Sequence, residues 1–220
     1  MRKGFFLTVF CLMLFVSTAA AETVTETGEL FPTSIRVQQF DDADLDGVWD
    51  SGENQIGEMN SENNLIPKGV WMFSQFGQKH WFQTVTIADG IKQDSRSTAS
   101  VTVKGVTPEE HLIIFGCARL CNVIGATFKD INGNGVFDSP EDAAMPGVEI
   151  KIEGKDCFNN KIKSSVKNTD SLGNATWLDM VPGSYTLTVT VPEGSVATTS
   201  ESCTLKAGPG ENAFGGFWLQ

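Results

Sequence analysis

The feature that most constrains this chain is an acidic twelve-residue loop that occurs twice. The first copy reads DADLDGVWDSGE at residues 42–53, and the second reads DINGNGVFDSPE at residues 130–141. A phenylalanine stands two positions before each copy, at Phe40 and Phe128, and the loops share their glycine, valine, serine and acidic positions. Internal repetition of this kind indicates two divergent copies of one structural module.

Oxygen-bearing side chains recur at alternate positions of both loops. Positions 1, 3, 5, 9 and 12 carry Asp, Asn or Glu, position 6 is glycine, and position 7 would offer its backbone carbonyl. Calcium binds six to eight hard oxygen ligands, and twelve-residue loops hold it with this spacing. The sequence therefore predicts two Ca²⁺ sites, formed by Asp42, Asp44, Asp46, Val48, Asp50 and Glu53 in the first loop and by Asp130, Asn132, Asn134, Val136, Asp138 and Glu141 in the second.

A solvated acidic turn without metal is the alternative interpretation of each loop. Two loops that match at every ligand position favour calcium, and the five carboxylates of the first loop would repel one another without a cation. With five carboxylates against three, the first loop is expected to bind calcium more tightly than the second. The aromatic residues at position 8, Trp49 and Phe137, are expected to pin the loops to a β core.

The remainder of the chain is dominated by β patterns. Short runs such as SVTVK and SYTLTVTV are rich in β-branched and aromatic residues, and turn signals such as ADG and VPGS separate them. The flanks of both loops also have strand character, which argues against a sensor that opens between two helices. We predict an all-β protein of two tandem Greek-key sandwich modules with EF-hand-like calcium loops, at residues 22–121 and 122–220.

The N-terminus has the order of a secretory signal peptide. Arg2 and Lys3 precede an apolar run, and small residues follow up to Ala21, after which cleavage is expected. That run is too short to span a bilayer, and no later stretch is long enough either. The net charge of −11 excludes nucleic acid and anionic membranes as partners. We expect signal peptide 1–21 to be removed and the protein to be secreted or held at the cell surface.

Four cysteines remain after the expected cleavage. An even number in an exported protein favours two disulfides, although three pairings are possible. Sequence position favours one bridge between the first two cysteines and one between the last two. A zinc site is disfavoured, because the two histidines, His80 and His111, lack zinc-ligand spacing to them. The disulfide candidates are thus Cys117 with Cys121 and Cys157 with Cys203.

The second half of the chain resembles a known family. The stretches IGATFKDINGNGVFDSPEDAAMPGVEIKIEG and TDSLGNATWLDMVPGSYTLTV are similar to the B domain of serine–aspartate repeat surface proteins, a calcium-binding relative of the collagen-adhesin B domain. The resemblance covers most of residues 122–220. Residues 30–121 share only the loop and its two flanking strands. It implies prealbumin-like, Ig-like sandwiches in tandem on a cell surface, held rigid by calcium and without catalysis.

Two further expectations follow from this resemblance. No serine–aspartate run, sorting motif or hydrophobic tail follows Gln220, so surface attachment would need a partner or a noncovalent contact. Some relatives of the fold carry an intramolecular lysine–asparagine bond, for which Lys129 and Asn212 are the candidates here, with Asp41 standing in the first unit where Lys129 stands in the second.

Function is expected to be structural or adhesive rather than enzymatic. The dense acidic clusters all fall within the calcium loops, which leaves few groups for catalysis. The alternative is a carbohydrate- or protein-binding module that uses the aromatic segment 69–82, with calcium as scaffold and with Trp71, Phe73 and Trp81 as binding residues. Against it, Trp71 and Phe73 are two apart on a strand and would fill a core. The expected partners are calcium and a surface glycan or cell-envelope protein.

Overall fold

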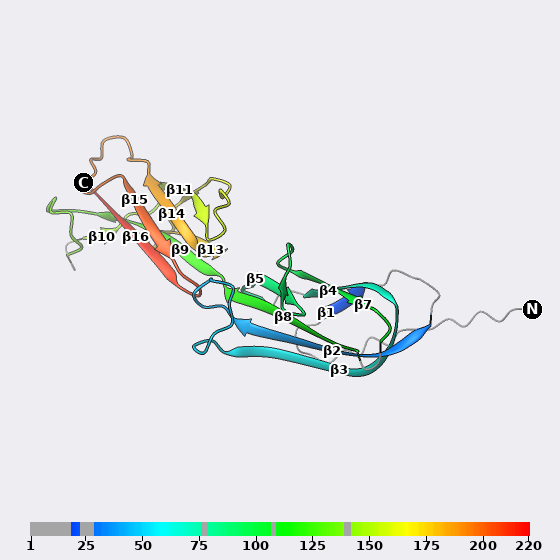
Figure 1. Ribbon diagram of the computed structural model, residues 1–220. Helices are drawn as coiled ribbons and strands as arrows, with labels where there is room; N and C mark the ends of the chain where they lie inside the picture. Colours follow the sequence, from blue (N-terminus) through cyan, green and yellow to red (C-terminus); the bar gives the residue numbers. More distant parts are fainter. Residues whose placement is uncertain (1–18, 23–28, 76–78, 107–108, 139–141) are drawn as a thin grey trace, which may run out of the picture. The chain divides into compact units, whose positions relative to one another are not determined.

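The computed structural model describes residues 19–22, 29–75, 79–106, 109–138 and 142–220, and every regular element in these ranges is a β-strand (Figure 1). The predicted all-β class is confirmed. The chain divides into two compact units. The first unit comprises Met1–Phe40, Asn54–Gln78 and Gln83–Gly116, and the second comprises Asp41–Glu53, Lys79–Phe82 and Cys117–Gln220. The first acidic loop therefore groups with the second unit, although the sequence places it in the first module.

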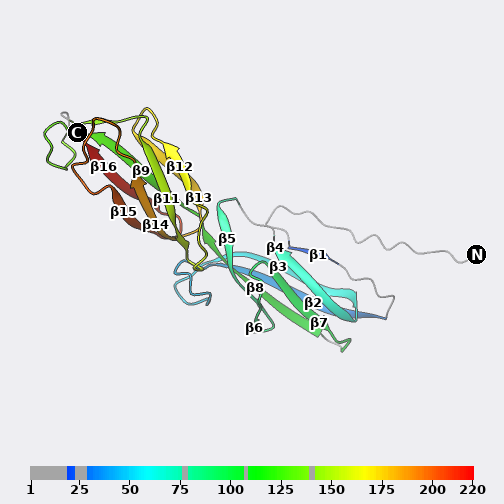
Figure 2. The same cartoon turned by 90° about the horizontal axis from the view of Figure 1, so that it is seen from above.

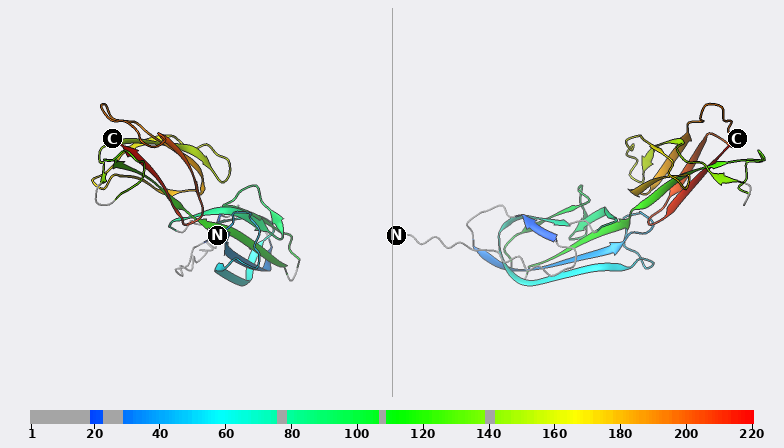
Figure 3. Two further views of the ribbon diagram at one scale, coloured as in Figure 1. Left: turned by 90° about the vertical axis from the view of Figure 1, so that its left-hand side faces the viewer. Right: turned by 180° about the vertical axis from the view of Figure 1, so that it is seen from behind.

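Two sheets make up the first unit. One has the strand order β3-β2-β8-β5-β6 and the other the order β1-β4-β7. Alternate residues of β7 are buried, as expected for strands with one face on a core. The strands of the larger sheet are β2 (Leu30–Asp41), β3 (Gln55–Pro67), β5 (Trp81–Ala88), β6 (Ile91–Lys92) and β8 (Glu109–Arg119), and those of the smaller are β1 (Ala19–Glu22), β4 (Gly69–Gln75) and β7 (Thr98–Val103) (Figure 3).

The core of the first unit is closely packed where β2 ends. Phe40 and Phe115 are fully buried there. Gly116 is required beside them, because a Cβ at that position would come within 2.7 Å of Thr84 and Val85 and within 2.9 Å of the Phe40 ring. Phe40 therefore anchors β2 two residues before the first loop begins.

The second unit is a sandwich of two four-stranded sheets (Figure 2). In one sheet β9 pairs in parallel with β16 and antiparallel with β13 and β10, and in the other the order is β12-β11-β14-β15. Ile150, Tyr185, Leu187, Val123 and Phe217 are fully buried in the core cluster. The strands are β9 (Cys121–Lys129), β10 (Ala143–Ala144), β11 (Glu149–Asp156), β12 (Ser165–Asn168), β13 (Asn174–Met180), β14 (Gly183–Val189), β15 (Ser202–Ala207) and β16 (Asn212–Leu219).

Neither predicted disulfide is formed in the structure. Cys117 and Cys121 lie four residues apart on nearly continuous strand, which separates their Cα atoms by roughly 13 Å, whereas a disulfide needs about 4–7 Å. Cys157 lies beside Pro182, whereas Cys203 pairs with Leu187 further along β14. Those five residues of strand correspond to roughly 16 Å, so the predicted pairings are both wrong.

The lysine–asparagine bond considered from the family resemblance is excluded by register. Lys129 lies opposite Leu219, and Asn212 lies opposite Asn122, so the two candidates stand at opposite ends of the β9–β16 pair. That places them roughly 20 Å apart. The side chain of Asn212 instead accepts a hydrogen bond from the Asn122 amide at 2.8 Å.

The predicted signal peptide falls largely on residues outside the described ranges. Its last three residues belong to β1, which pairs with β4 from Ala19 opposite Gln75 to Glu22 opposite Met72. The cleavage after Ala21 stays a prediction. Within the described ranges no helix is long and apolar enough to cross a membrane.

Candidate metal centre

The first loop leaves β2 through a buried carboxylate. Asp42 is fully buried, and its amide donates to the carbonyl of Cys117 at 2.8 Å, which fixes the start of the loop. Leu45 and Gly47 then adopt left-handed backbone with φ of 67° and 75°. These two residues turn the chain back on itself, so that successive acidic side chains face the same space.

Three carboxylates gather inside this turn. Oxygens of Asp42, Asp44 and Asp46 all lie within 4.8 Å of one another. One oxygen of Asp42 accepts from the amide of Gly47 at 3.3 Å, but its Oδ2 is buried without a hydrogen-bond partner. A buried charged oxygen without a partner costs free energy, and like charges at this spacing repel. This set of oxygen donors fits a hard cation such as calcium.

Glu53 closes the first loop. Its two oxygens accept from the amides of Ala43 at 2.9 Å and of Asp50 at 3.4 Å. Burial raises the pKa of Glu53 above its usual value, and the charges of Asp42 and Asp44 add to this, against the lowering effect of the two amides. Asp50 is turned toward the amide of Gly52 at 3.2 Å and is not one of the three gathered carboxylates.

The second loop begins on a buried carboxylate that is fully bonded. Asp130 accepts from the amides of Gly133 at 2.7 Å, Asn134 at 3.2 Å and Gly135 at 2.8 Å. Its Oδ2 also accepts from the hydroxyl of Thr198 at 2.5 Å. The bond from Thr198, ahead of those from the amides, holds the pKa of Asp130 below its usual value.

In this loop two asparagines stand at positions where the first loop has carboxylates, and they donate hydrogen bonds to a third side chain. The side-chain amides of Asn132 and Asn134 both donate to Oδ2 of Asp138, at 3.0 and 2.6 Å. These two bonds lower the pKa of Asp138. The second loop thus has side-chain amides that donate to one of its carboxylates. In the first loop Asp42, Asp44 and Asp46 accept from backbone amides, at 3.3, 3.1 and 2.7 Å.

Asp142 closes the second loop, a residue that the sequence pattern did not select. It is buried, and its two oxygens accept from the amides of Ile131 at 3.1 Å and Asp138 at 3.0 Å. These amides are at positions 2 and 9 of the loop, the positions whose amides Glu53 accepts in the first loop. The predicted ligand Glu141 lies outside the described residues. The only sequence signal for Asp142 is the adjacent pair Glu141-Asp142.

The aromatic ring at position 8 of the second loop lies against the sandwich. The Phe137 ring is 5.1 Å from that of Phe128 on β9, which in turn is 5.3 Å from the ring of Trp218 on β16. The loop is thereby packed onto two paired strands of the core. Trp49, the matching residue of the first loop, is half-buried.

The aromatic segment does not present the predicted binding residues as one exposed surface. Phe73 is buried in the core of the first unit, so its assignment as a binding residue is wrong. Trp71 is half-buried two residues before it on β4. Trp81 belongs to the second unit, where the guanidinium of Arg119 lies 5.2 Å from its ring centroid.

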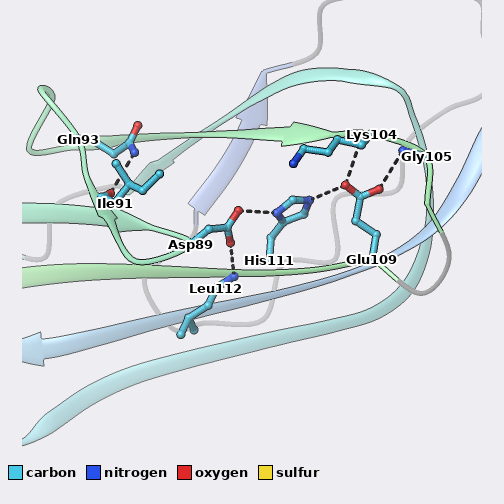
Figure 4. Close-up of polar contacts among 8 residues, drawn as sticks. All are labelled: Asp89, Ile91, Gln93, Lys104, Gly105, Glu109, His111 and Leu112. Atoms are coloured by element: carbon cyan, nitrogen blue, oxygen red, sulfur yellow. Dashed lines mark hydrogen bonds and ion pairs between the residues drawn. The ribbon is translucent and has the colours of Figure 1, made fainter.

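A further cluster of charged side chains lies in the first unit (Figure 4). The His111 ring is held between two carboxylates, with Nδ1 at 2.7 Å from Asp89 and Nε2 at 3.4 Å from Glu109. Glu109 also accepts from the amides of Lys104 at 2.8 Å and Gly105 at 3.0 Å. Burial acts to raise the pKa of Glu109, but these bonds and the His111 charge lower it overall. Both imidazole nitrogens face carboxylates, so the cluster is a structural clasp and not a nucleophile–base pair.

Residues 122–208 match the family model described as the SdrD B-like domain. That stretch is similar to the SdrD B-like domain. The resemblance found in the sequence is confirmed there, and domains of this kind are structural, without enzymatic activity. The match covers less than half of the chain and excludes the first unit, so the interpretation as a tandem pair stays a prediction.

Other similarities are more distant. The chain is 29% identical over 118 residues to Colossin-A of Dictyostelium discoideum, a match that covers 54% of this chain and 1% of that protein. Three pilins of solved structure also align, each at a TM-score too low to support an argument about this chain. They are the minor pilin GBS52 of Streptococcus agalactiae (10% identity, 85% of this chain and 95% of that chain, TM-score 0.36), a streptococcal ancillary pilin (12%, 89% and 64%, 0.38) and the shaft pilin SpaA of Lactobacillus rhamnosus GG (9%, 86% and 97%, 0.31).

Proposed function

We propose that this protein is a non-enzymatic structural or adhesive protein of the cell surface or extracellular space, and that calcium bound in its acidic loops makes it rigid. The observation that carries the proposal is the first loop, where a buried oxygen of Asp42 has no hydrogen-bond partner and two further carboxylates lie within 4.8 Å. A cation is the chemical partner that such a set of acceptors requires.

In the first loop the ion would be held by three carboxylates, those of Asp42, Asp44 and Asp46. The Val48 carbonyl and the carboxylates of Asp50 and Glu53 would complete the set of oxygen ligands. In the second loop Asp130, Asn132, Asn134, Asp138 and the Val136 carbonyl are the candidate ligands, together with Glu141 or Asp142. Bound calcium would supply positive charge that offsets the repulsion among these carboxylates. The chain's own contribution is to fix the loop ends, through Asp42 to Cys117 and through Asp130 to Thr198.

Rigidity follows from linkage between binding and folding. A ligand that binds only the folded loop stabilises the fold by RT ln(1 + [Ca]/Kd), which is about 2.7 kcal/mol at a hundredfold excess over Kd. The first loop joins β2 to β3, and the second joins β9 to β10. Fixing these connections would restrain strands of both units.

A surface or secreted location is supported by the SdrD B-like domain at 122–208, by the predicted signal peptide and by the net charge of −11. An extracellular or cell-envelope protein is the partner class that such a role implies.

Thermal unfolding of the full chain, in calcium and then in chelator, tests the proposal. We expect the melting temperature to fall by several degrees in chelator and to recover when calcium is added in excess. Magnesium at the same concentration is the control, because its smaller octahedral shell suits these loops less well. A melting temperature that is the same in calcium and chelator, with no heat in a calorimetric calcium titration, would overturn the proposal.

A further inference from the structure

Two cysteines lie on either side of one short crossover in the second unit. The segment 180–182 leads from β13 in one sheet to β14 in the other. Cys121, at the start of β9, pairs with Met180, and its thiol donates to the Met180 carbonyl at 3.2 Å. Cys157, just after β11, donates its amide to the Pro182 carbonyl at 2.7 Å.

We propose that Cys121 and Cys157 form a disulfide that links the two sheets of the second unit. The two carbonyls belong to positions only two apart in the chain, so they lie within about 7 Å of each other. Each cysteine is in hydrogen-bond contact with one of them. Cys203 is not an alternative partner for Cys157, because it pairs with Leu187 well along β14. Cys117 is not an alternative partner for Cys121, because extended chain separates them.

The electrostatics of the crossover agree with this proximity. Burial, and then the nearby groups Glu211 and Cys157, raise the pKa of Cys121 to about 11. Tyr185, whose hydroxyl donates to the Val181 carbonyl in the middle of the crossover, also has a raised pKa, from burial and then from Cys121, Asp156 and Cys157.

The two thiols differ in exposure, and this sets the order of reaction. Cys121 is 1% exposed, whereas Cys157 is exposed. The Cys157 thiolate therefore attacks first, on a small-molecule disulfide such as oxidised glutathione, forming a mixed disulfide and releasing one glutathione thiolate. The Cys121 sulfur then displaces the second glutathione. Two protein thiols lose two electrons and two protons, and one glutathione disulfide becomes two glutathione thiols.

The bridge would close a covalent loop around the second acidic loop, since residues 130–142 lie between Cys121 and Cys157. It would also tie β9 to the end of β11, and so join the two sheets at the end of the sandwich where β13 crosses over. A cross-link of this kind stabilises by restricting the unfolded chain. The disulfide does not need calcium. This proposal is therefore tested independently of the proposed function.

Peptide mapping tests the pairing. The full chain is reduced, freed of reductant, incubated with oxidised glutathione, quenched in acid, alkylated under denaturing conditions and digested. We expect a peptide pair joined through Cys121 and Cys157, two hydrogens lighter than the separate peptides, with Cys117 and Cys203 alkylated. A bond from Cys157 to Cys203, or glutathione retained on Cys157 without transfer to Cys121, would overturn the proposal.

Two cysteine variants distinguish loss of the disulfide from a folding defect, because each is compared with itself in the oxidised and the reduced state. Cys157→Ser changes an exposed residue and should fold, but its melting temperature should be the same with and without reductant. Wild type and Cys203→Ser should both melt several degrees higher after oxidation than after reduction. An oxidation-dependent shift that survives in Cys157→Ser, or that disappears in Cys203→Ser, would contradict the assignment.

Discussion

The two acidic loops share a sequence pattern but reach different local solutions. In the first, oxygens of Asp42, Asp44 and Asp46 crowd together and one of them is buried without a partner. In the second, the corresponding oxygens of Asp130 accept four hydrogen bonds, and the two asparagines donate to Asp138. The difference teaches that the spacing of oxygen donors sets the shape of the turn. We propose that the choice between Asp and Asn sets how stable that turn is without a cation.

The largest expected effect comes from the same substitution at the first position of each loop. Asp42→Asn should weaken calcium binding at the first loop by about a hundredfold. It should leave stability in chelator unchanged or raised, because it removes a buried negative charge of which one oxygen has no hydrogen-bond partner. Asp130→Asn should lower the melting temperature by several degrees with or without calcium, because it weakens four hydrogen bonds. Calorimetric titration and thermal unfolding measure both effects. If the two variants lose the same stability in chelator, the two loops do not differ in how they are stabilised without calcium, and the comparison is wrong.

Converting the second loop into the first is the next strongest test. The double change Asn132→Asp with Asn134→Asp should raise calcium affinity at the second loop by about tenfold or more. It should also lower stability in chelator, because Asp138 loses two donors and gains two like charges. Asn159→Asp, at an exposed turn where the side chain accepts from Lys155, adds a negative charge away from the loop and should do neither. An unchanged affinity in the double variant would show that charge does not distinguish the loops.

A smaller effect separates the two candidates for closing the second loop. Asp142→Asn removes a carboxylate that accepts two loop amides, whereas Glu141→Gln removes the charge of the residue beside it. We expect Asp142→Asn to lower the melting temperature in chelator by a few degrees and Glu141→Gln to leave it within about one degree. If Glu141→Gln proves the more destabilising in chelator, Asp142 does not close the loop.

The smallest effect on calcium is expected at the clasp in the first unit. Glu109→Gln should destabilise that unit by roughly 1–3 kcal/mol at pH 7 and leave calcium affinity unchanged. The folded-state pKa of Glu109 is lowered, so its contribution is present above the ordinary value near 4.5 and is lost as pH falls through the folded-state value. The gap between variant and wild type, followed by unfolding at a series of pH values, should therefore close as the pH falls below that ordinary value. If the difference in stability between Glu109→Gln and wild type changes when calcium is added, the acidic loops are not independent of this cluster.

The sequence predicts what is local in this protein and misses what depends on tertiary register. The all-β class and the SdrD B-like stretch follow from short β-branched runs and motif spacing, which each segment carries by itself. The disulfide pairing does not, because whether Cys157 lies near Cys121 or Cys203 depends on where the crossover 180–182 falls. The same register places Lys129 and Asn212 at opposite ends of two paired strands.

Within the candidate site, the spacing of positions 1, 3 and 5 was enough to select Asp42, Asp44 and Asp46, because a tight turn brings alternate residues together. Asp142 was missed because the second loop closes one residue later than the fixed pattern allows. Phe73 was misassigned as a binding residue because an aromatic on a strand has the same sequence signature on a buried and on an exposed face.

Hydrogen exchange of the loop amides in chelator, before and after calcium is added, tests the central claim most directly. The account predicts that the amide of Gly135, which donates to Asp130 at 2.8 Å, is protected in chelator already. The amides of Asp46 and Gly47, which donate to Asp44 and Asp42 at 3.1 and 3.3 Å, should exchange faster than it until calcium slows them. Rapid exchange of the second loop in chelator, or protection of the first loop that calcium does not increase, would contradict it.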